Sequence, residues 1–421
     1  MATSRPKQLF TTSEVIESIF TAGSGDEIED SKDDRDYDND LEDDSDLLGD
    51  VPDRAAEEID QDPQDPYNAD TEVEFDDQAD SDIDSDVDEN GEPQWVKNVN
   101  HFPQIPLFTG QPGIKATIPD DPSPIDIFNL FITDELIAEW KTETNHYART
   151  VINSKDLQLL SNRSRFKKWK PVTLREMREF IAICIHIGLI TKPTLHDYWT
   201  RHPGLHSSYC SKVMDRERYL SILAFFHIAD NGTFLPADNP DHDRIHKIRP
   251  FIKHLNIKFK EVYEPRQDIC IDEAMVPFKG RSRFKVFMKD KPTKWEFKLY
   301  VLCESGTGYV YNLEMYCADK RISNKPVDVT MRLMEPLLNK GYKLYLDNYY
   351  CCLELWTRLQ RHWTMMVGTC RKNRVGMPRD LFVERQRQGD LDFRRKGQLI
   401  VTRWFVKREV VTLSTFHQPQ L

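Results

Sequence analysis

The sequence predicts an α/β (α+β) protein, in which a mainly helical module precedes a core built on a mixed β-sheet, behind an acidic tail. Three observations support this fold class. The 421 residues divide sharply by charge, helix-period apolar stripes fill residues 120–262, and short apolar strands follow from residue 267. Apolar residues repeat every 3.6 positions in helices and every two in strands, so the change of pattern marks a change of architecture. The expected domains are 1–94, 95–262, 263–370 and 371–421.

The acidic tail comes first. Residues 26–90 hold 31 Asp or Glu and three Lys or Arg, whereas residues 91–421 hold 52 basic and 37 acidic residues, so the net charge of −13 hides a basic body. Such a tail buries too little apolar surface to offset its chain entropy, and we expect residues 1–94 to be disordered. One interpretation of this tail is a solubilising segment. The other is an interaction segment, which either mimics nucleic acid and competes for the basic body or binds basic chromatin proteins.

The helical module is predicted from apolar stripes at 124–140, 173–189, 215–227 and 250–262. Thr173 and Glu176 form a capping box at the start of the second stripe. No run of about twenty apolar residues occurs, which predicts no membrane span. No C-x-x-C pair occurs, so spacing predicts no zinc module, and the eight cysteines fit buried thiols in a reducing compartment.

The sheet core is predicted from strands at 267–278, 295–303, 309–316, 342–346 and 364–368, with a crossover helix at 325–338. Three antiparallel strands, a crossover helix and a further strand form the pattern of a mixed sheet of the RNase H type. Beyond residue 371 the composition turns basic and loop-like, and short strands at 398–405 and 409–416 follow. We interpret 371–421 as a β-rich insertion.

Two acids stand at the ends of core strands, Asp272 after the first and Asp347 after the fourth. Adjacent strand ends bring acids that are distant in sequence close together. Phosphodiester cleavage uses two divalent ions about 3.5–4 Å apart, and such hard cations prefer carboxylate oxygens. Each acid also has an ordinary interpretation as a turn residue or helix cap.

Basic residues surround the two acids in the sequence. Lys279 and Arg281 follow the first acid, Lys298 lies on the next strand, and Arg371 and Lys372 follow the last core strand. Cationic side chains supply the phosphate contacts of nucleic-acid binding proteins. We expect these five residues to contact double-stranded DNA, although a run of charges is also typical of a solvated face.

These acids lie in the motifs Ile271-Asp-Glu-Ala-Met-Val-Pro-Phe-Lys-Gly-Arg281 and Leu346-Asp-Asn-Tyr-Tyr350. Further motifs in order are ETNHYA at 143–148, DYW at 197–199, DKPTKWEFK at 290–298, CESGTGY at 303–309, GTCRKN at 368–373 and STFH at 414–417. The set, over roughly residues 105–417, resembles the piggyBac transposase family. The resemblance implies an RNase H-like transposase core, cut-and-paste DNA transposition with Mg²⁺ or Mn²⁺, a nuclear location and a possible homodimer. It also implies that Asp272 and Asp347 are the first two catalytic, metal-binding acids.

In that family a third acid lies further along, beyond a segment like 414–417, and a cysteine-rich zinc module follows it. The sequence ends at Leu421, so we expect neither in this chain. Glu354, Asp390 and Asp392 do not stand at the family's position. We therefore expect a transposase-derived DNA-binding protein, domesticated or truncated, that is catalytically defective and not an enzyme. Two alternatives remain open, an active transposase or nuclease if the full product is longer, and a degenerate reading frame.

Overall fold

A computed structural model describes residues 93–97, 103–154, 165–278, 280, 282, 284–287 and 295–418. The predicted acidic tail lies outside these residues, apart from its last two. The chain divides into two compact units. The helical unit holds Ile118–Leu255 and Val276–Phe297, and the sheet unit holds the described residues up to Thr117, Asn256–Met275 and those from Lys298 on. No helix of the described residues is long and apolar enough to cross a membrane.

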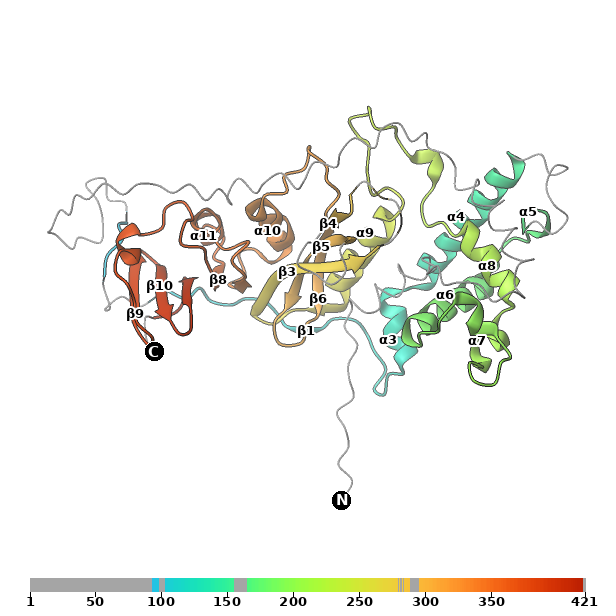
Figure 1. Cartoon of the computed structure of the whole chain (residues 1–421), viewed down its shortest axis with the longest axis horizontal. Coiled ribbons are helices and arrows are strands. Elements are labelled where there is room, and N and C mark those ends of the chain that lie inside the picture. Colours follow the sequence, from blue (N-terminus) through green and yellow to red (C-terminus); the bar gives the residue numbers. More distant parts are fainter. Residues whose placement is uncertain are drawn as a thin grey trace, which may run out of the picture. The chain divides into compact units, whose positions relative to one another are not determined.

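Short helices build the first unit (Figure 1). They are α3 (Pro124–Phe131), α4 (Asp134–Asn153), α5 (Arg165–Lys168), α6 (Leu174–Leu189), the 3-10 helix η1 (Leu195–Trp199), α7 (Ser208–Val213), α8 (Arg216–Phe225), the 3-10 helix η2 (Asn231–Thr233) and the first part of α9 (Arg249–Val262). Their apolar faces supply a core that includes Trp140, Met177, Phe180 and Ile222. The helical module expected from the apolar stripes is present.

Capping residues set where these helices begin. The predicted capping box is confirmed, because Thr173 Oγ1 accepts from Glu176 N at 3.2 Å and Glu176 Oε2 accepts from Thr173 N at 2.9 Å. The single helix expected over 124–140 is two helices. Thr133 has extended backbone angles and its side chain accepts from Leu136 N, so a new helix, α4, begins there and runs to Asn153. The side chain of such an N-cap residue accepts a hydrogen bond from a backbone N–H in the first turn, which has no partner within the helix.

The second unit is organised on strands of a nine-stranded mixed sheet. The strands are β3 (Asp268–Pro277), β4 (Val286–Phe287), β5 (Trp295–Glu304), β6 (Val310–Met315), β7 (Lys343–Leu346), β8 (Met365–Thr369), β9 (Leu391–Lys396), β10 (Leu399–Phe405) and β11 (Glu409–Ser414). Their order is β4-β5-β3-β7-β8-β11-β10-β9, and β6 also pairs with β5. A small separate sheet joins β1 (Gly113–Ile114) and β2 (Tyr263–Glu264).

The strand directions confirm the predicted mixed sheet. β5 and β6 are antiparallel, whereas β7 is parallel to both β3 and β8. Parallel neighbours need crossover connections, and two helical segments provide them. They are α10 (Pro326–Met334) with the 3-10 helix η3 (Glu335–Leu337) before β7, and α11 (Leu353–Gln360) before β8. The later strands extend the same sheet, since β11 pairs antiparallel with β8. A further 3-10 helix, η4 (Arg379–Phe382), precedes β9.

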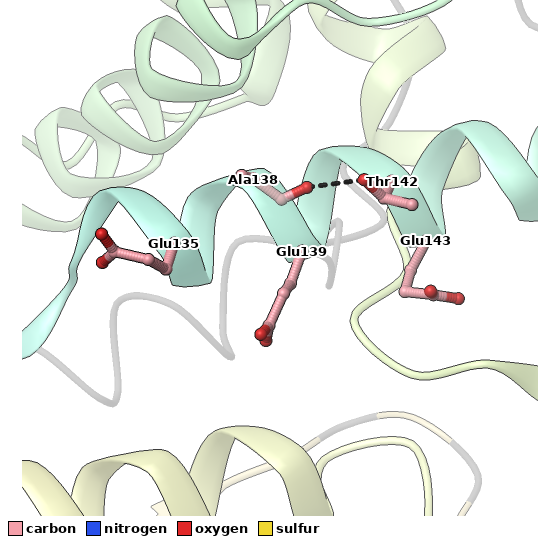
Figure 2. Close-up of a pocket in the computed structure, with 5 residues that line it drawn as sticks. All are labelled: Glu135, Ala138, Glu139, Thr142 and Glu143. Atoms are coloured by element: carbon pink, nitrogen blue, oxygen red, sulfur yellow. Dashed lines mark hydrogen bonds between the residues drawn. The ribbon is translucent and has the colours of Figure 1, made fainter.

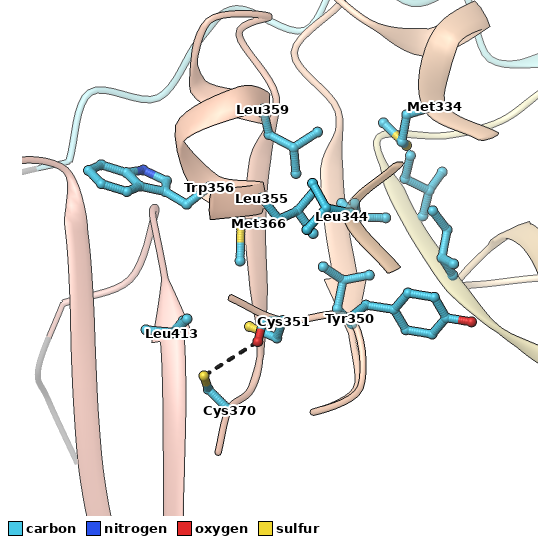
Figure 3. Close-up of a cluster of buried hydrophobic side chains, with 14 of the residues drawn as sticks. Met334, Leu344, Tyr350, Cys351, Leu355, Trp356, Leu359, Met366, Cys370 and Leu413 are labelled. Atoms are coloured by element: carbon cyan, nitrogen blue, oxygen red, sulfur yellow. Dashed lines mark hydrogen bonds between the residues drawn. The ribbon is translucent and has the colours of Figure 1, made fainter. Parts of the chain in front are cut away.

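The core of the sheet unit lies between the strands and the crossover helices. Figure 3 shows the part beneath α11, where Leu355 and Leu359 face Leu344 and Met366 of the parallel strands. All four side chains are fully buried. Burying a side chain of this size stabilises a protein by about 1.5–3 kcal/mol. The parallel pair β7–β8 is therefore firmly held against α11.

Candidate metal centre

The two predicted catalytic acids meet at one edge of the sheet. β3 and β7 are parallel with Ile271 opposite Leu346, so Asp272, within β3, and Asp347, just after β7, are the next residues along the two chains. The strand end expected at Asp272 lies further on, because β3 continues to Pro277. Both acids are exposed to solvent. The carboxyl ends of parallel strands are the usual position of ligand sites in such sheets, and here the pair lies at the carboxyl end of β7, where its pairing with β3 stops. The register thus brings together two carboxylates that lie far apart in the sequence.

Local hydrogen bonds orient both carboxylates. Asp272 Oδ1 accepts from the backbone N–H of Glu273 at 2.8 Å, and Asp347 Oδ1 accepts from the backbone N–H of Tyr349 at 2.9 Å. The surrounding protein partly shields Asp272 from water and thereby raises its pKa, and the negative charges of Glu273 and Asp347 raise it further. Like charges that converge in this way favour a cation between them.

A half-buried network supports the first acid from the other side. Lys298 Nζ lies 3.3 Å from Glu273 Oε1, and the hydroxyl of Tyr350 donates to the same oxygen at 2.8 Å. The Lys298 ammonium also lies over the rings of Tyr300 and Tyr349, at 5.0 and 4.6 Å from their centroids. Sequence reasoning named Lys298 but missed Glu273 and Tyr350, because the alternation of strand residues does not show which polar side chains meet across strands.

The other predicted DNA contacts divide into two groups. Lys279 and Arg281 lie outside the described residues. Arg371 and Lys372 follow β8, whose Gly368 is opposite Leu346, so they leave the sheet at the edge that carries Asp347. The Lys372 side chain is 66% exposed and its Nζ lies 3.7 Å from Glu409 Oε2.

Arg374, two residues after Lys372, lies in a different environment from that exposed lysine. It is buried, and its Nη2 donates to the carbonyl oxygens of Asn348 and Tyr349 at 3.0 and 2.8 Å. A guanidinium fixed on two carbonyls holds the loop that follows Asp347. Arg374 therefore positions the second acid instead of facing a ligand.

The donor set fits a hard divalent cation. Exposed carboxylate oxygens are the ligands that Mg²⁺ and Mn²⁺ prefer, and Mg²⁺ sites commonly use one or two protein carboxylates together with substrate phosphates and water. Asp272 and Asp347 are thus the residues that would hold such an ion.

No third acid from the earlier candidates joins this pair. Glu354 pairs with Arg358 on α11 at 2.7 Å. Asp390 accepts from the backbone of Arg387, and Asp392 pairs with Lys97 at 2.8 Å. Within the part of the chain that the structure describes, only one group of three potential ligands converges, and it lies in the helical unit.

Comparisons with known proteins place this fold and site in context. The family model described as Transposase IS4 matches residues 123–421. The chain is similar to two human proteins, PiggyBac transposable element-derived protein 3, at 26% identity over 307 residues, and PiggyBac transposable element-derived protein 2, at 23% over 297 residues. The matches cover 70% and 67% of this chain and 48% and 46% of those proteins, so the chain spans about half the length of these relatives.

A solved structure has the same fold. It is the cryo-EM structure of a piggyBac transposase synaptic complex with hairpin DNA, with a TM-score of 0.64 and 22% identity. The match covers 72% of this chain and 63% of that one. The likeness confirms the mixed α/β architecture with an RNase H-like core.

Proposed function

The chain belongs to the Transposase IS4 family and resembles its piggyBac-type members, and from this premise we propose that it binds double-stranded DNA along the sheet edge that carries Asp272 and Asp347. It would do so with Mg²⁺ or Mn²⁺ held between the acids and the DNA phosphates. The observation that carries the proposal is the parallel register of β3 and β7, which sets the two acids side by side.

The basic residues at this edge support phosphate binding. Arg371 and Lys372 follow β8, the strand paired with β7, and Lys279 and Arg281 follow β3 in the sequence. Bound at the acid pair, a divalent ion would neutralise phosphate charge and stabilise a developing negative charge on oxygen. Asp347, oriented by Tyr349 N–H and by the Arg374-held loop, would keep its carboxylate aimed at that ion.

We also propose that the two acids alone support little strand cleavage. A two-ion centre requires ligands that hold both ions at a fixed separation. In the described residues, no group of three potential ligands includes both Asp272 and Asp347, and the neighbouring Glu273 is paired with Lys298. The function proposed for this chain is thus DNA binding by a transposase-derived protein in the nucleus. The proposed binding form is a homodimer. The acidic residues 26–90 would be available to basic chromatin proteins.

The alternative function is an active cut-and-paste transposase or nuclease. It is favoured by the intact Asp272–Asp347 pair, which an additional carboxylate from elsewhere would complete. The two functions differ in one measurable property, namely divalent-ion-dependent breakage of DNA.

The test is nicking of supercoiled DNA by the 421-residue chain in Mg²⁺ or Mn²⁺, with Asp272→Ala as the matched variant. We expect binding to the DNA, with affinity that falls steeply as salt rises because phosphate contacts release counterions. We expect equal background nicking by both proteins. Nicking by the wild type alone would establish the alternative, and absence of DNA binding at low salt would overturn both functions.

A further inference from the structure

Three side chains with metal-binding groups converge in the helical unit, apart from the proposed DNA edge. Glu143 and His146 lie on α4, three residues apart and therefore on one helix face. Asp230 lies in the loop between α8 and η2. One ligand atom from each of the three lies within 4.8 Å of the other two.

The distances between the ligand atoms are too long for hydrogen bonds and suit atoms that bind one ion together. His146 Nδ1 lies 3.8 Å from Glu143 Oε2 and 3.8 Å from Asp230 Oδ1, whereas a hydrogen bond to oxygen requires about 2.7–3.2 Å. Two ligand atoms on one tetrahedral Zn²⁺ lie about 3.3 Å apart, because Zn–N and Zn–O bonds are about 2.0–2.2 Å. The two His146 distances are about 0.5 Å longer than this separation, and small side-chain rotations would shorten them.

The loop that carries Asp230 is held against α4 before any ion binds. Thr144, which is fully buried, exchanges two hydrogen bonds with the backbone of His227, at 3.1 Å to its carbonyl and 3.2 Å from its N–H. Asp230 is fixed by Gly232 N–H, which donates to Oδ1 at 2.7 Å, and by His246, whose Nε2 lies 2.9 Å from the Asp230 carbonyl oxygen. The ligands come from two anchored segments, so little conformational entropy remains to be lost on binding.

The charge around the cluster also favours a cation. Glu143 ends a row of acids on α4 with Glu135 and Glu139, and the row lines a shallow hollow beside that helix (Figure 2). Clustered charges of one sign raise the local concentration of counterions. Only Glu143 of this row joins the three-ligand group, which makes Glu139 a suitable control.

We propose that Glu143, His146 and Asp230 bind one Zn²⁺ ion, with the fourth position open to water or another ligand. An imidazole nitrogen in the set favours a transition metal over Mg²⁺. The ion would join α4 to the loop after α8 and so stabilise the helical unit. This site is separate from the acid pair of the sheet unit and does not depend on the function proposed there.

The experiment is titration of the full-length chain with Zn²⁺, followed by calorimetry, and with Co²⁺, followed by visible absorption. We expect saturable binding, with Co²⁺ bands that lack thiolate charge transfer, since the site contains no sulfur. His146→Gln and Asp230→Asn should each weaken binding at least about tenfold, because each removes a direct ligand and even second-shell changes cost 10–100-fold. Zn²⁺ should raise the melting temperature of the wild type and not of these variants.

Glu139→Gln is the matched control, and it should bind Zn²⁺ as the wild type does. Binding that is unchanged in His146→Gln, or a Co²⁺ spectrum dominated by thiolate bands, would overturn the proposal. So would a loss of the Zn²⁺ effect in Asp272→Asn, which would assign the ion to the sheet edge. Circular dichroism in EDTA verifies that each variant is folded before titration.

Discussion

Lys298 and Lys372 show how two lysines near one site differ in role. Lys298 is largely covered, pairs with Glu273 at 3.3 Å and lies over two tyrosine rings, whereas Lys372 is 66% exposed. That Lys298 binds DNA stays a prediction, and its surroundings assign it a structural contribution as well. Removing the Lys298 ammonium group would leave the Glu273 carboxylate shielded from water and without its positively charged partner.

We predict that Lys298→Met affects stability and that Lys372→Met affects DNA binding. Lys298→Met should lower the free energy of unfolding by about 1–3 kcal/mol, the cost of leaving a shielded charged group without a partner. Lys372→Met should weaken DNA binding severalfold and reduce its salt dependence by about one counterion, with stability unchanged. Urea denaturation and fluorescence anisotropy with labelled duplex measure the two effects. A large loss of DNA affinity in folded Lys298→Met would show that it contacts DNA directly.

His227 makes the helical unit sensitive to acid. Burial lowers the pKa of His227 to about 4, and the positive charge of Lys247 adds to this shift. Its ring stacks on Tyr147, with centroids 3.5 Å apart. Because the folded state keeps this imidazole neutral while the unfolded chain binds a proton below pH 6.5, stability is lost as the pH falls from about 6.5 towards 4.

His227→Phe should remove part of this acid sensitivity. It keeps an aromatic ring against Tyr147 and cannot be protonated, so the loss of unfolding free energy between pH 7 and pH 4.5 should shrink, by at most about 3 kcal/mol. Urea denaturation at the two pH values provides the measurement. The exposed His202→Gln is the control and should behave as the wild type. An identical acid loss in His227→Phe would show that other groups cause it.

At the scale of elements, the close approach of β7 and β8 depends on Gly368. A Cβ at this position would lie 2.4 Å from the carbonyl oxygen of Leu346, one residue before Asp347. Gly368→Ala should therefore push the strands apart and destabilise the protein by about 1–3 kcal/mol, as other overpacked core substitutions do. Gly306→Ala, whose Cβ would come no closer than 4.0 Å to Glu304, should have little effect in the same denaturation assay. Equal stability of the two variants would contradict the tight packing.

The approach of the two acids could be predicted from sequence because each acid follows a short apolar run, but the expected strand end at Asp272 was wrong, since β3 continues to Pro277. The mixed sheet followed from the same local patterns. The division between α3 and α4 was missed, although Thr133 followed by two acids is an N-cap signal. The pairing of β11 with β8 and the buried position of Arg374 are non-local. Local periodicity carries no information about such contacts.

At the scale of the whole molecule, opposite charges occupy different parts of one chain. Residues 26–90 hold 31 acids, and residues 91–421 carry an excess of basic residues. If the acidic segment competes with DNA for the basic body, deleting residues 26–90 should strengthen duplex binding at least severalfold at low salt. The gain should fade as salt screens the attraction. Unchanged affinity across the salt series would leave the segment with a solubilising or partner-binding role.

The central proposal at this scale is that the sheet edge at Asp272 and Asp347 is a divalent-ion-dependent DNA site. Without a bound ion, the two carboxylates repel phosphate. Neutralising them with Asp272→Asn and Asp347→Asn together should then strengthen duplex binding in EDTA and remove any further effect of the ion. The wild type should instead gain affinity when the ion is added.

The most direct test is a thermodynamic cycle of duplex affinity, with wild type and the Asp272→Asn/Asp347→Asn variant, in EDTA and in Mn²⁺ at constant ionic strength. The account predicts that Mn²⁺ tightens wild-type binding severalfold relative to the variant. Equal responses of the two proteins to Mn²⁺ would contradict it.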